Sequence, residues 1–459
     1  MEVIADLHLH SRYSRAVSQQ MVIPEIAKWA IEKGIGLVGT GDWTHPLWFR
    51  ELKEYLKEVR EGLYMLRSSA TNFDSASDSL AKNGGLLDES HRRSQNEASQ
   101  NLAVSPHIKK DHFTPYFILS TEISSIYSQD GKSHRIHNLI FAPSLAMVEE
   151  INHQLRNHGV NLLSDGRPIT GLSSRQICEI VFSVDRNCLI IPAHVWTPWY
   201  SLYGSISGFD SLKECFGEFA DRIFAIETGL SSDPAMNWRI ADLDNRSIVS
   251  FSDAHSPQKL GREATIFELE ENFDYQQFRE AVVNQKITST IEFYPEEGKY
   301  HWTGHRNCHI KQSPQQTKNL GSICPVCGRK LTIGVMHRVE DLASRPANFK
   351  PENRPPYKMM VTLIEILAEV KNSNVSSQSV INEYHFLTEN FGSEFTILLK
   401  TPVEEVSKIG GEKLAEAINK VRKGDIFIDP GYDGVFGTVK IWPLADVQSE
   451  PAKEQMSLF

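Results

Sequence analysis

The 459-residue sequence has no apolar run of 18 residues, few cysteines for its length and no excess of positive charge. The missing apolar run excludes a membrane-spanning helix. No basic, apolar leader is visible at the first residues, so we expect a cytoplasmic protein. Six cysteines do not make a disulfide framework in a chain of this size. The net charge of −10 argues at first against a polyanionic partner.

The distribution of charge changes that view. Between Lys299 and Lys358, eleven Lys and Arg residues face three acidic ones, a local balance of +8 that leaves −18 for the rest of the chain. Such asymmetry predicts a basic module beside an acidic one.

Apolar runs alternate with helical stretches up to about residue 295. This alternation predicts an α/β fold with a mostly parallel sheet, open or closed into a barrel. The expected strands are 2–10, which ends in two histidines, 35–38, 116–121, 138–142, 189–192, 223–226 and 248–251. The expected helices are 23–33, 47–61, 145–157 and 174–184.

Residues with metal-ligating side chains adjoin most of these strands. His8 and His10 alternate with Leu9, so both imidazoles lie on one face of the first strand. An isolated pair of this kind is more often a surface or core pair, but here the ligand types recur. The set is His8, His10, Asp42, Glu122, His137, His194, Asp253 and His255.

Ligands of these types suit Zn, Mn, Fe or Mg, and eight of them exceed the need of one ion. We therefore expect two or three divalent ions, with Asp253 as a bridging carboxylate. Such clusters hydrolyse phosphoesters, although ligand types alone leave amide or ring hydrolysis open.

A second, cysteine-based cluster is predicted further along. His305 and Cys308 precede Cys324 and Cys327, and each pair has the two-residue spacing of a small zinc ribbon. A closed site of four ligands is structural rather than catalytic. His309 and His301 are rival fourth ligands, and two structural thiols with a chance cysteine are the alternative interpretation.

Four segments complete the expected organisation. Residues 68–111 are rich in Ser, Asn, Asp and Gly and predict a mobile insertion in the first domain. A zinc-binding basic domain is expected over 296–345 and a C-terminal α+β or helical domain over 346–449. In the latter, Ile409–Ile418 loosely resembles a helix-hairpin-helix, whose Gly-rich turn offers N–H groups to a phosphate. A plain pair of packed helices is the competing interpretation. Residues 450–459 predict a flexible tail.

Three motifs resemble those of the polymerase and histidinol phosphatase (PHP) family: Asp6–Ser11, Pro192–His194 and Ser252–His255. The resemblance implies a distorted (β/α)7 barrel over 1–295 with a trinuclear metal site. The eight residues above would be its ligands, with Asp253, His194 and His255 as catalytic residues. The chain departs from many members in having Gly41-Asp42 where they have Asp-His, and Arg12-Tyr13-Ser14 where they place a further ligand.

Further motifs are similar to the endonuclease Q enzymes: Ala193–Trp199, Gly304–Cys308, Ile323–Arg329 and Pro430–Gly434. This resemblance implies a metal-dependent endonuclease that nicks DNA 5′ to deaminated bases (uracil, hypoxanthine, xanthine) and abasic sites. It implies a nucleoid-associated enzyme acting on double-stranded DNA with lesions, and single-stranded DNA as well. Trp196, Trp199 and Tyr203 would cover an extruded base, unless they only pack in the core. A PHP-type phosphatase and a non-catalytic DNA-binding scaffold are the alternatives.

The last five residues resemble the bacterial sliding-clamp-binding motif. Gln455 would bond the rim of the clamp pocket, while Met456, Leu458 and Phe459 would fill an apolar groove. The alternative is a hydrophobic terminus without a partner, or one that docks on its own domain.

Overall fold

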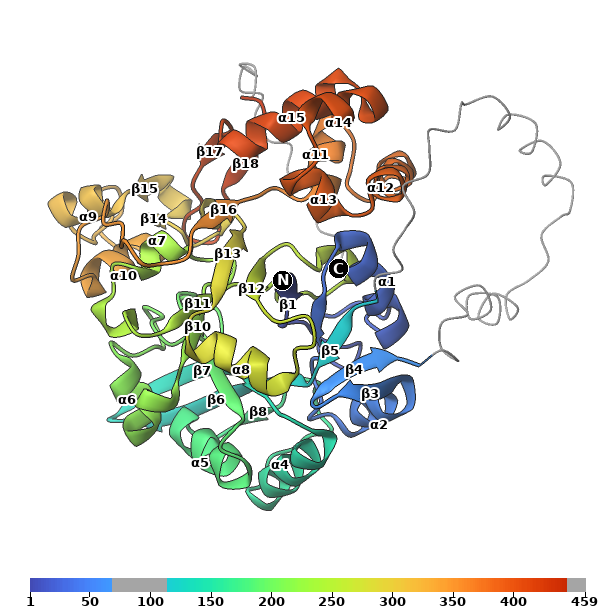
Figure 1. Ribbon diagram of the computed structural model, residues 1–459. Coiled ribbons are helices and arrows are strands. Elements are labelled where there is room, and N and C mark those ends of the chain that lie inside the picture. The colour runs from blue at the N-terminus through green and yellow to red at the C-terminus, as the bar shows by residue number, and fades with distance from the viewer. Residues whose placement is uncertain (68–113, 444–459) are drawn as a thin grey trace, which may run out of the picture.

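The computed structural model describes residues 1–67 and 114–443. The predicted insertion and the predicted tail with its clamp motif lie outside these residues. Within them, no helix has both the length and the apolar character needed to cross a bilayer. Figure 1 shows an α/β body with two smaller groups of elements beside it.

The first half of the body alternates strands and helices. Its strands are β1 (Glu2–Asp6), β2 (Leu37–Gly39), β3 (Leu56–Arg60), β4 (Leu63–Leu66), β5 (Tyr116–Ile118), β6 (Ser120–Gln129), β7 (Lys132–Phe141) and β8 (Ile169–Thr170). Its helices are α1 (Ile23–Lys33), α2 (Pro46–Tyr55), α4 (Leu145–Asn157) and α5 (Ser174–Val184).

The second half of the body is built in the same way. Its strands are β9 (Leu189–Pro192), β10 (Ala225–Glu227), β11 (Ser247–Val249), β12 (Ala264–Glu268) and β13 (Ile287–Glu292). Its helices are α6 (Leu212–Phe216), α7 (Pro234–Asn237) and α8 (Tyr275–Val283).

The two smaller groups follow in chain order. The first holds β14 (Thr303–His305), β15 (Ile310–Gln312), α9 (Pro314–Leu320) and α10 (Val335–Leu342). The strand that comes next, β16 (Tyr357–Met359), pairs with β13 of the body. The second holds α11 (Leu363–Val370), α12 (Gln378–Phe391), α13 (Glu394–Leu399), α14 (Val403–Gly410), α15 (Glu412–Lys423), β17 (Phe427–Asp429) and β18 (Thr438–Lys440).

Several predicted elements are confirmed to the residue, among them α1, α4, α5 and β9. The helix expected over 47–61 is wrong in its second half, because the chain leaves α2 at Tyr55 and forms the β3–β4 hairpin. Gly62, at φ +66°, makes the turn that lets the two strands pair. Pairing with a neighbouring strand outweighed the local helical pattern.

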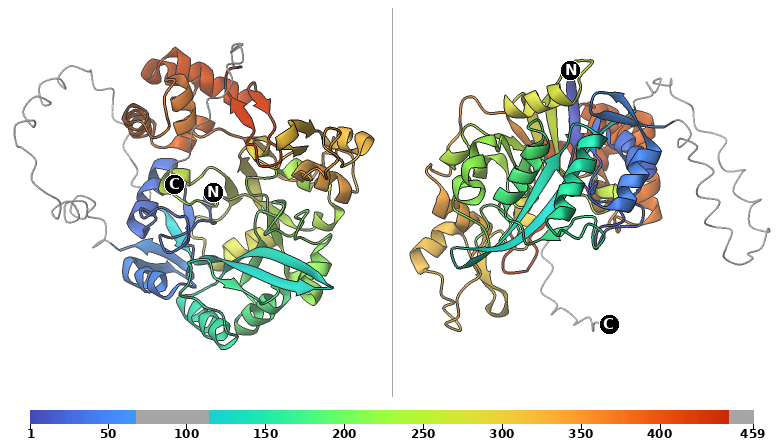
Figure 2. Two further views of the ribbon diagram at one scale, coloured as in Figure 1. Left: turned by 180° about the vertical axis from the view of Figure 1, so that it is seen from behind. Right: turned by 90° about the horizontal axis from the view of Figure 1, so that it is seen from below.

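The expectation of a mostly parallel sheet is also wrong. β1 lies parallel to β2, and β2 to β5, but β1 lies antiparallel to β12 and β12 to β13. The long β6–β7 hairpin, prominent in Figure 2, adds a four-stranded sheet that is largely antiparallel. Hairpins need only a short turn between strands, so they enter an α/β fold wherever two strands are adjacent in sequence.

Although the strands form separate sheets, backbone bonds carry them around a closed circle. β1, β2, β5 with β6, β7 and β9 are neighbours by ladder pairing, as are β10 and β11. Val195 N–H donates to the carbonyl of Glu227 (3.1 Å) and so links the end of β9 to β10. His10 N–H donates to the carbonyl of Ala254 (3.0 Å), which returns the circle to β1. If β5 and β6, which follow one another directly in the chain, are counted as one strand, seven strands are thus linked in a circle.

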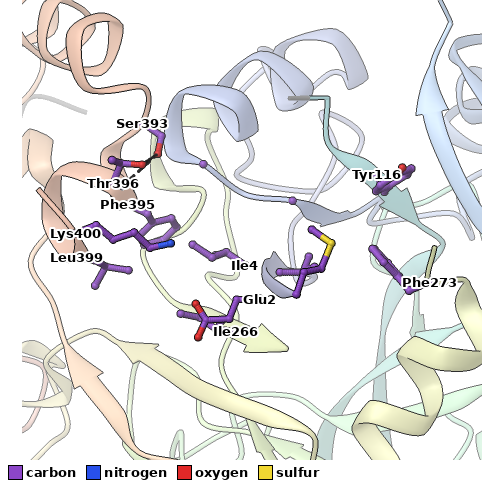
Figure 3. Close-up of a pocket in the computed structure, with 14 residues that line it drawn as sticks. Glu2, Ile4, Tyr116, Ile266, Phe273, Ser393, Phe395, Thr396, Leu399 and Lys400 are labelled. Carbon is purple, nitrogen blue, oxygen red and sulfur yellow. Dashed lines mark hydrogen bonds between the residues drawn. The ribbon is translucent and has the colours of Figure 1, made fainter. Parts of the chain in front are cut away.

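The C-terminal helices pack against the outside of this body (Figure 1). α1 ends at Gly34, which adopts φ +85°, and a Cβ there would collide with Ser393 at the start of α13. Lys33 and Glu394 form a buried ion pair at 2.6 Å across the same contact. A cavity of about 200 Å³ lies beside it, between the N-terminal end of β1 and α13 (Figure 3). This cavity is a gap between packed elements. It lies at the N-terminal end of β1, whereas His8 and His10 follow the C-terminal end.

Two buried carboxyl groups, Glu292 at the end of β13 and Glu263 just before β12, make the stability of the fold depend on pH. Burial raises the pKa of Glu292 to about 8, an effect that bonds from Thr290 and Ser250 only partly offset. Burial and the proximity of Glu292 also raise the pKa of Glu263 well above its usual value. Because the folded pKa exceeds the unfolded one, this stabilisation is complete below about pH 4 and is lost as the pH rises through about 8.

Glu292→Gln should therefore flatten the decline of stability at alkaline pH. Between pH 6 and pH 9 we expect the native protein to lose roughly 2–4 kcal/mol more unfolding free energy than the variant. Urea unfolding at three pH values measures this difference. Glu268→Gln, at an exposed position on β12, is the matched control and should keep the native slope. Parallel slopes for the native protein and Glu292→Gln would show that Glu292 is ionised throughout.

Candidate metal centre

The two histidines that follow β1 are oriented by carboxylates behind them. His8 Nδ1 lies 2.9 and 3.1 Å from the two oxygens of Glu227. His10 Nδ1 lies 3.0 Å from Asp42. All four side chains are buried. A carboxylate that accepts the Nδ1 proton leaves the other ring nitrogen, Nε2, free as a ligand atom.

Those two Nε2 atoms meet the carboxylate of Asp253. Asp253 Oδ1 lies 3.1 Å from His10 Nε2 and 3.5 Å from His8 Nε2. All three atoms are buried, and despite these short distances none of them makes a hydrogen bond of acceptable geometry within the described chain. Leaving buried polar atoms unpaired is costly unless something else binds them. The donor set of two imidazoles and a carboxylate fits a divalent cation.

A second group of ligand atoms adjoins the first through Glu122. Glu122 Oε1 lies 2.8 Å from His137 Nδ1 and 3.2 Å from His194 Nε2. The same carboxylate lies 3.6 Å from His8 Nε2 and 3.5 Å from His10 Nε2. Glu122 thus belongs to two groups, one with His8 and His10 and the other with His137 and His194, and each is compact enough to hold an ion.

A third compact group consists of His10, Asp253 and His255. His255 is 37% exposed at its side chain, the most open of the predicted ligands in this group. The structure thus brings His8, His10, Glu122, His137, His194, Asp253 and His255 together around the strand ends. These groups could bind metal ions.

Asp42 is adjacent to these ligands but faces them differently. Its Oδ1 is paired with His10, and its Oδ2 accepts from Ser11 N (2.6 Å), Ser11 Oγ (2.7 Å) and Ser14 Oγ (2.8 Å). A carboxylate whose oxygens are all engaged acts on the metal through the histidine that it orients. We propose this positioning role for Asp42 in place of direct ligation.

The backbone at these positions is held in an unusual conformation. Asp42, His194 and Asp253 all have positive φ, at 45°, 31° and 47°. Non-glycine residues rarely adopt such angles, and those that do gather at functional sites. The conformation of His194 depends on Gly229, because a Cβ at position 229 would collide with the His194 side chain.

The ionisation of the site follows from its crowding. Burial lowers the pKa of His8, but the charges of Glu227 and Asp253 outweigh it and hold that pKa well above its usual value. In the same way Asp42 and Asp253 raise the pKa of His10 to about 9. Burial lowers the pKa of His137 to about 4. The carboxylates therefore attract positive charge at His8 and His10, and a bound cation would replace those protons.

Two residues of the site, Glu227 and Arg167, were not predicted from the sequence. Glu227 ends β10, and the pattern of ligand types after apolar runs would have found it directly after Ile226. Arg167 donates to Glu122 Oε2 at 3.0 Å from the stretch between α4 and α5. No motif or spacing marks Arg167, because only the fold brings it to the site.

A cavity of about 520 Å³ opens beside the ligands. His137, His194 and Asp253 line one side, and Trp199, Tyr200, Tyr300 and Phe436 supply its aromatic surface. Trp196 and Tyr203 belong to the core instead, because they are 1% and 0% exposed. Their polar ends bond Asn237 and Asp242. Of the three aromatic residues predicted for a base pocket, only Trp199 therefore faces the cavity.

The predicted cysteine cluster also assembles. The ligand atoms of His305, Cys308, Cys324 and Cys327 lie within 4.8 Å of one another and could hold a structural zinc ion. His305 Nδ1 is 3.5 Å from Cys327 Sγ. The rival His301 is buried apart from this group and lines the large cavity. The rival His309 is outside the group as well.

Comparison with known proteins gives three kinds of match. Residues 362–425 match a family described as the MJ0043 C-terminal domain. Uncharacterized protein MJ0043 of Methanocaldococcus jannaschii is 34% identical over 256 residues, which are 54% of this chain and 31% of that protein. The chain thus spans about a third of that relative's length. Uncharacterized protein YqxK of Bacillus subtilis is 29% identical over 329 residues, 70% of this chain and 78% of that one.

Two of the solved structures that are similar to this chain match nearly its whole length. One is the lesion-specific endonuclease PfuEndoQ from Pyrococcus furiosus, with a TM-score of 0.77, 31% identity and 98% of each chain covered. The other is endonuclease Q in complex with a 27-mer duplex substrate with an abasic lesion at the active site. It has a TM-score of 0.76 and 31% identity, and the match covers 98% of this chain and 99% of that one.

Proposed function

The chain belongs to the endonuclease Q family, and we propose that it is a metal-dependent DNA repair endonuclease. It would hydrolyse the phosphodiester 5′ to deaminated bases (uracil, hypoxanthine, xanthine) and abasic sites. The observation that carries the proposal is the convergence of the unpaired atoms His8 Nε2, His10 Nε2 and Asp253 Oδ1. The circle of seven strands around them would be the distorted (β/α)7 barrel of the PHP fold.

The residues of the site would divide their work by position. Divalent ions bound here would supply a hydroxide near neutral pH and stabilise the leaving oxygen. His8, His10, Glu122, His137, His194, Asp253 and His255 would hold two or three such ions. Glu227 and Asp42 would fix the orientation of the imidazoles. Arg167 would add a positive charge beside the ligands, where a phosphodiester brings negative charge.

The cavity beside the ligands would receive the damaged nucleotide. An enzyme that acts at a lesion extrudes the target from the stack, which costs least where the pairing is already weak. Trp199 and Tyr300, whose rings lie 5.3 Å apart between centroids, offer an aromatic wall for a base. An extruded abasic nucleotide, which has no base, would fill only part of the same cavity. The cavity can therefore accept both deaminated bases and abasic sites.

The basic module would contribute part of the DNA surface. Some of its cations instead tie the module to the body, as Arg338 does with Asp210 and Arg345 with Asp244, both at 2.5 Å. No carboxylate of the described chain forms a salt bridge with Lys299, Arg329 or Lys330. We expect these three to reach phosphates. The α14–α15 hairpin around Gly411 is a further candidate, with plain helix packing as the alternative.

Nicking assays separate the proposal from its rivals. With Mn²⁺ or Mg²⁺, the protein should cut a labelled duplex once, 5′ to a single uracil, and leave the matched undamaged duplex whole. A PHP-type phosphatase would release phosphate from small monoesters and leave the duplex intact. A scaffold would bind the duplex without cutting it.

The C-terminal tail gives an independent prediction. A chain ending at Lys453 should lose binding to the bacterial sliding clamp. It lacks Met456, Leu458 and Phe459, whose side chains we propose to fill the apolar groove of the clamp. Nicking of short oligonucleotides should be unchanged, since a tethered weak site acts only by raising local concentration. Titration of the clamp with both chains measures this. Equal binding of the two would exclude the motif.

A further inference from the structure

An exposed aromatic side chain stands beside the metal-site cavity on the segment that joins β17 to β18. Phe436 is 69% exposed, the highest fraction among the large apolar side chains of the described residues. It lines the same cavity as His194 and Asp253. A single exposed apolar residue is ordinary, so its meaning depends on how the chain holds it there.

The backbone around Phe436 is fixed on both sides. Before it, Tyr432 and Val435 exchange backbone bonds of 3.0 and 2.8 Å, and Gly434 N–H donates to the carbonyl of Lys299 at 2.8 Å. After it, Gly437 N–H donates to the carbonyl of Glu297 at 2.9 Å.

Side chains and close packing add to these bonds. Asp433 accepts from Arg306 N (2.7 Å) and from Thr332 Oγ1 (2.5 Å). A Cβ at Gly437 would collide with the carbonyl of Glu296, so the backbones touch there. The segment is thus clamped to the basic module while its aromatic side chain points to solvent.

The neighbours of Phe436 suit a nucleic acid. Lys299 Nζ lies 5.6 Å from the centroid of the Phe436 ring and 5.8 Å from that of Tyr300. A cation beside exposed rings at a cavity mouth combines phosphate attraction with a stacking surface. The aromatic wall of Trp199 and Tyr300 continues behind it.

We propose that Phe436 is a wedge, which enters the duplex stack at the space vacated by the extruded nucleotide while the cavity behind it holds that nucleotide. This rests on the proposed function, because it requires an extruded lesion. Apolar wedges stabilise unstacked duplexes in other DNA-binding proteins by replacing lost stacking. A rigid backbone suits the role, since ordering the segment costs nothing on binding.

The test compares duplex with single-stranded substrate. Phe436→Ala should lower kcat/KM on a uracil-containing duplex by about tenfold or more, but change nicking of the same strand alone by less than about threefold. Phe436→Leu should retain most of the duplex activity. Phe386→Ala is the matched control, because Phe386 is 50% exposed on α12 and does not line the cavity. An equal loss on both substrates, or none on duplex, would overturn the wedge.

A binding measurement keeps this test apart from that of the nuclease itself. Without added Mn²⁺ or Mg²⁺ and with the structural zinc retained, a duplex with 2-aminopurine beside an abasic site should brighten with native protein and with Phe386→Ala, but remain dark with saturating Phe436→Ala. If the protein shows no nicking activity but the brightening still depends on Phe436, the proposed nuclease function is refuted and the wedge role of Phe436 is supported. Brightening with Phe436→Ala would refute the wedge whatever the activity.

Discussion

Asp253→Ala should abolish nicking, on the order of a thousandfold or more in kcat, while duplex binding stays close to native. Asp253 Oδ1 converges with the Nε2 atoms of His8 and His10, so the substitution would remove a proposed metal ligand. Binding should persist because it depends mainly on phosphate contacts elsewhere. The double change His8→Ala/His10→Ala should behave alike and lower the bound metal, as measured by elemental analysis.

The backbone conformation of Asp253 complicates the interpretation of Asp253→Ala, because the substitution can strain the backbone as well as remove the carboxylate. Its φ of 47° is better tolerated by Asp and Asn than by Ala, so Asp253→Asn removes the charge with less strain. Asp130→Ala is the matched control, since Asp130 has φ 51° at the exposed turn between β6 and β7 and no place among the ligands. Nicking by Asp253→Asn at the native rate, with metal content verified, would remove Asp253 from the mechanism.

Cys324→Ser should release one equivalent of zinc and unfold the basic module. A structural zinc supplies folding free energy directly, and Cys324 is the buried thiol of its group. Affinity for DNA should fall, and the slope of log K against log salt should become shallower, because fewer cations reach phosphates. Metal analysis, limited proteolysis and a salt titration measure the three effects.

Cys188→Ser is the control, since it alters a buried thiol outside the cysteine cluster. It should keep the zinc content and the salt slope of the native protein. Purified native protein without zinc at the cysteine cluster would exclude the ribbon. An unchanged salt slope in a zinc-free Cys324→Ser protein would show that the module does not bind DNA.

The sequence by itself determined what depends on neighbours along the chain. Pro24 at the start and Gly34 at the end were enough to place α1 at Ile23–Lys33. The two-residue spacings were enough to group Cys308 with Cys324 and Cys327. The alternation of His8, Leu9 and His10 predicted two imidazoles on one face. The predicted strand was too long, because β1 ends at Asp6 and beyond it only Leu9 pairs, in a single bridge with Ala254.

The tertiary structure decided everything that depends on distant segments meeting. It distinguished two carboxylates, since only the fold shows both oxygens of Asp42 engaged, while Asp253 Oδ1 has no hydrogen-bond partner among the described residues. It placed His305, and neither His301 nor His309, beside the three cysteines, and it brought Arg167 to Glu122. It buried Trp196 and left Phe436 in solvent, although both are large and apolar. Burial and pairing are properties of the assembled core, and residue type fixes them only on average.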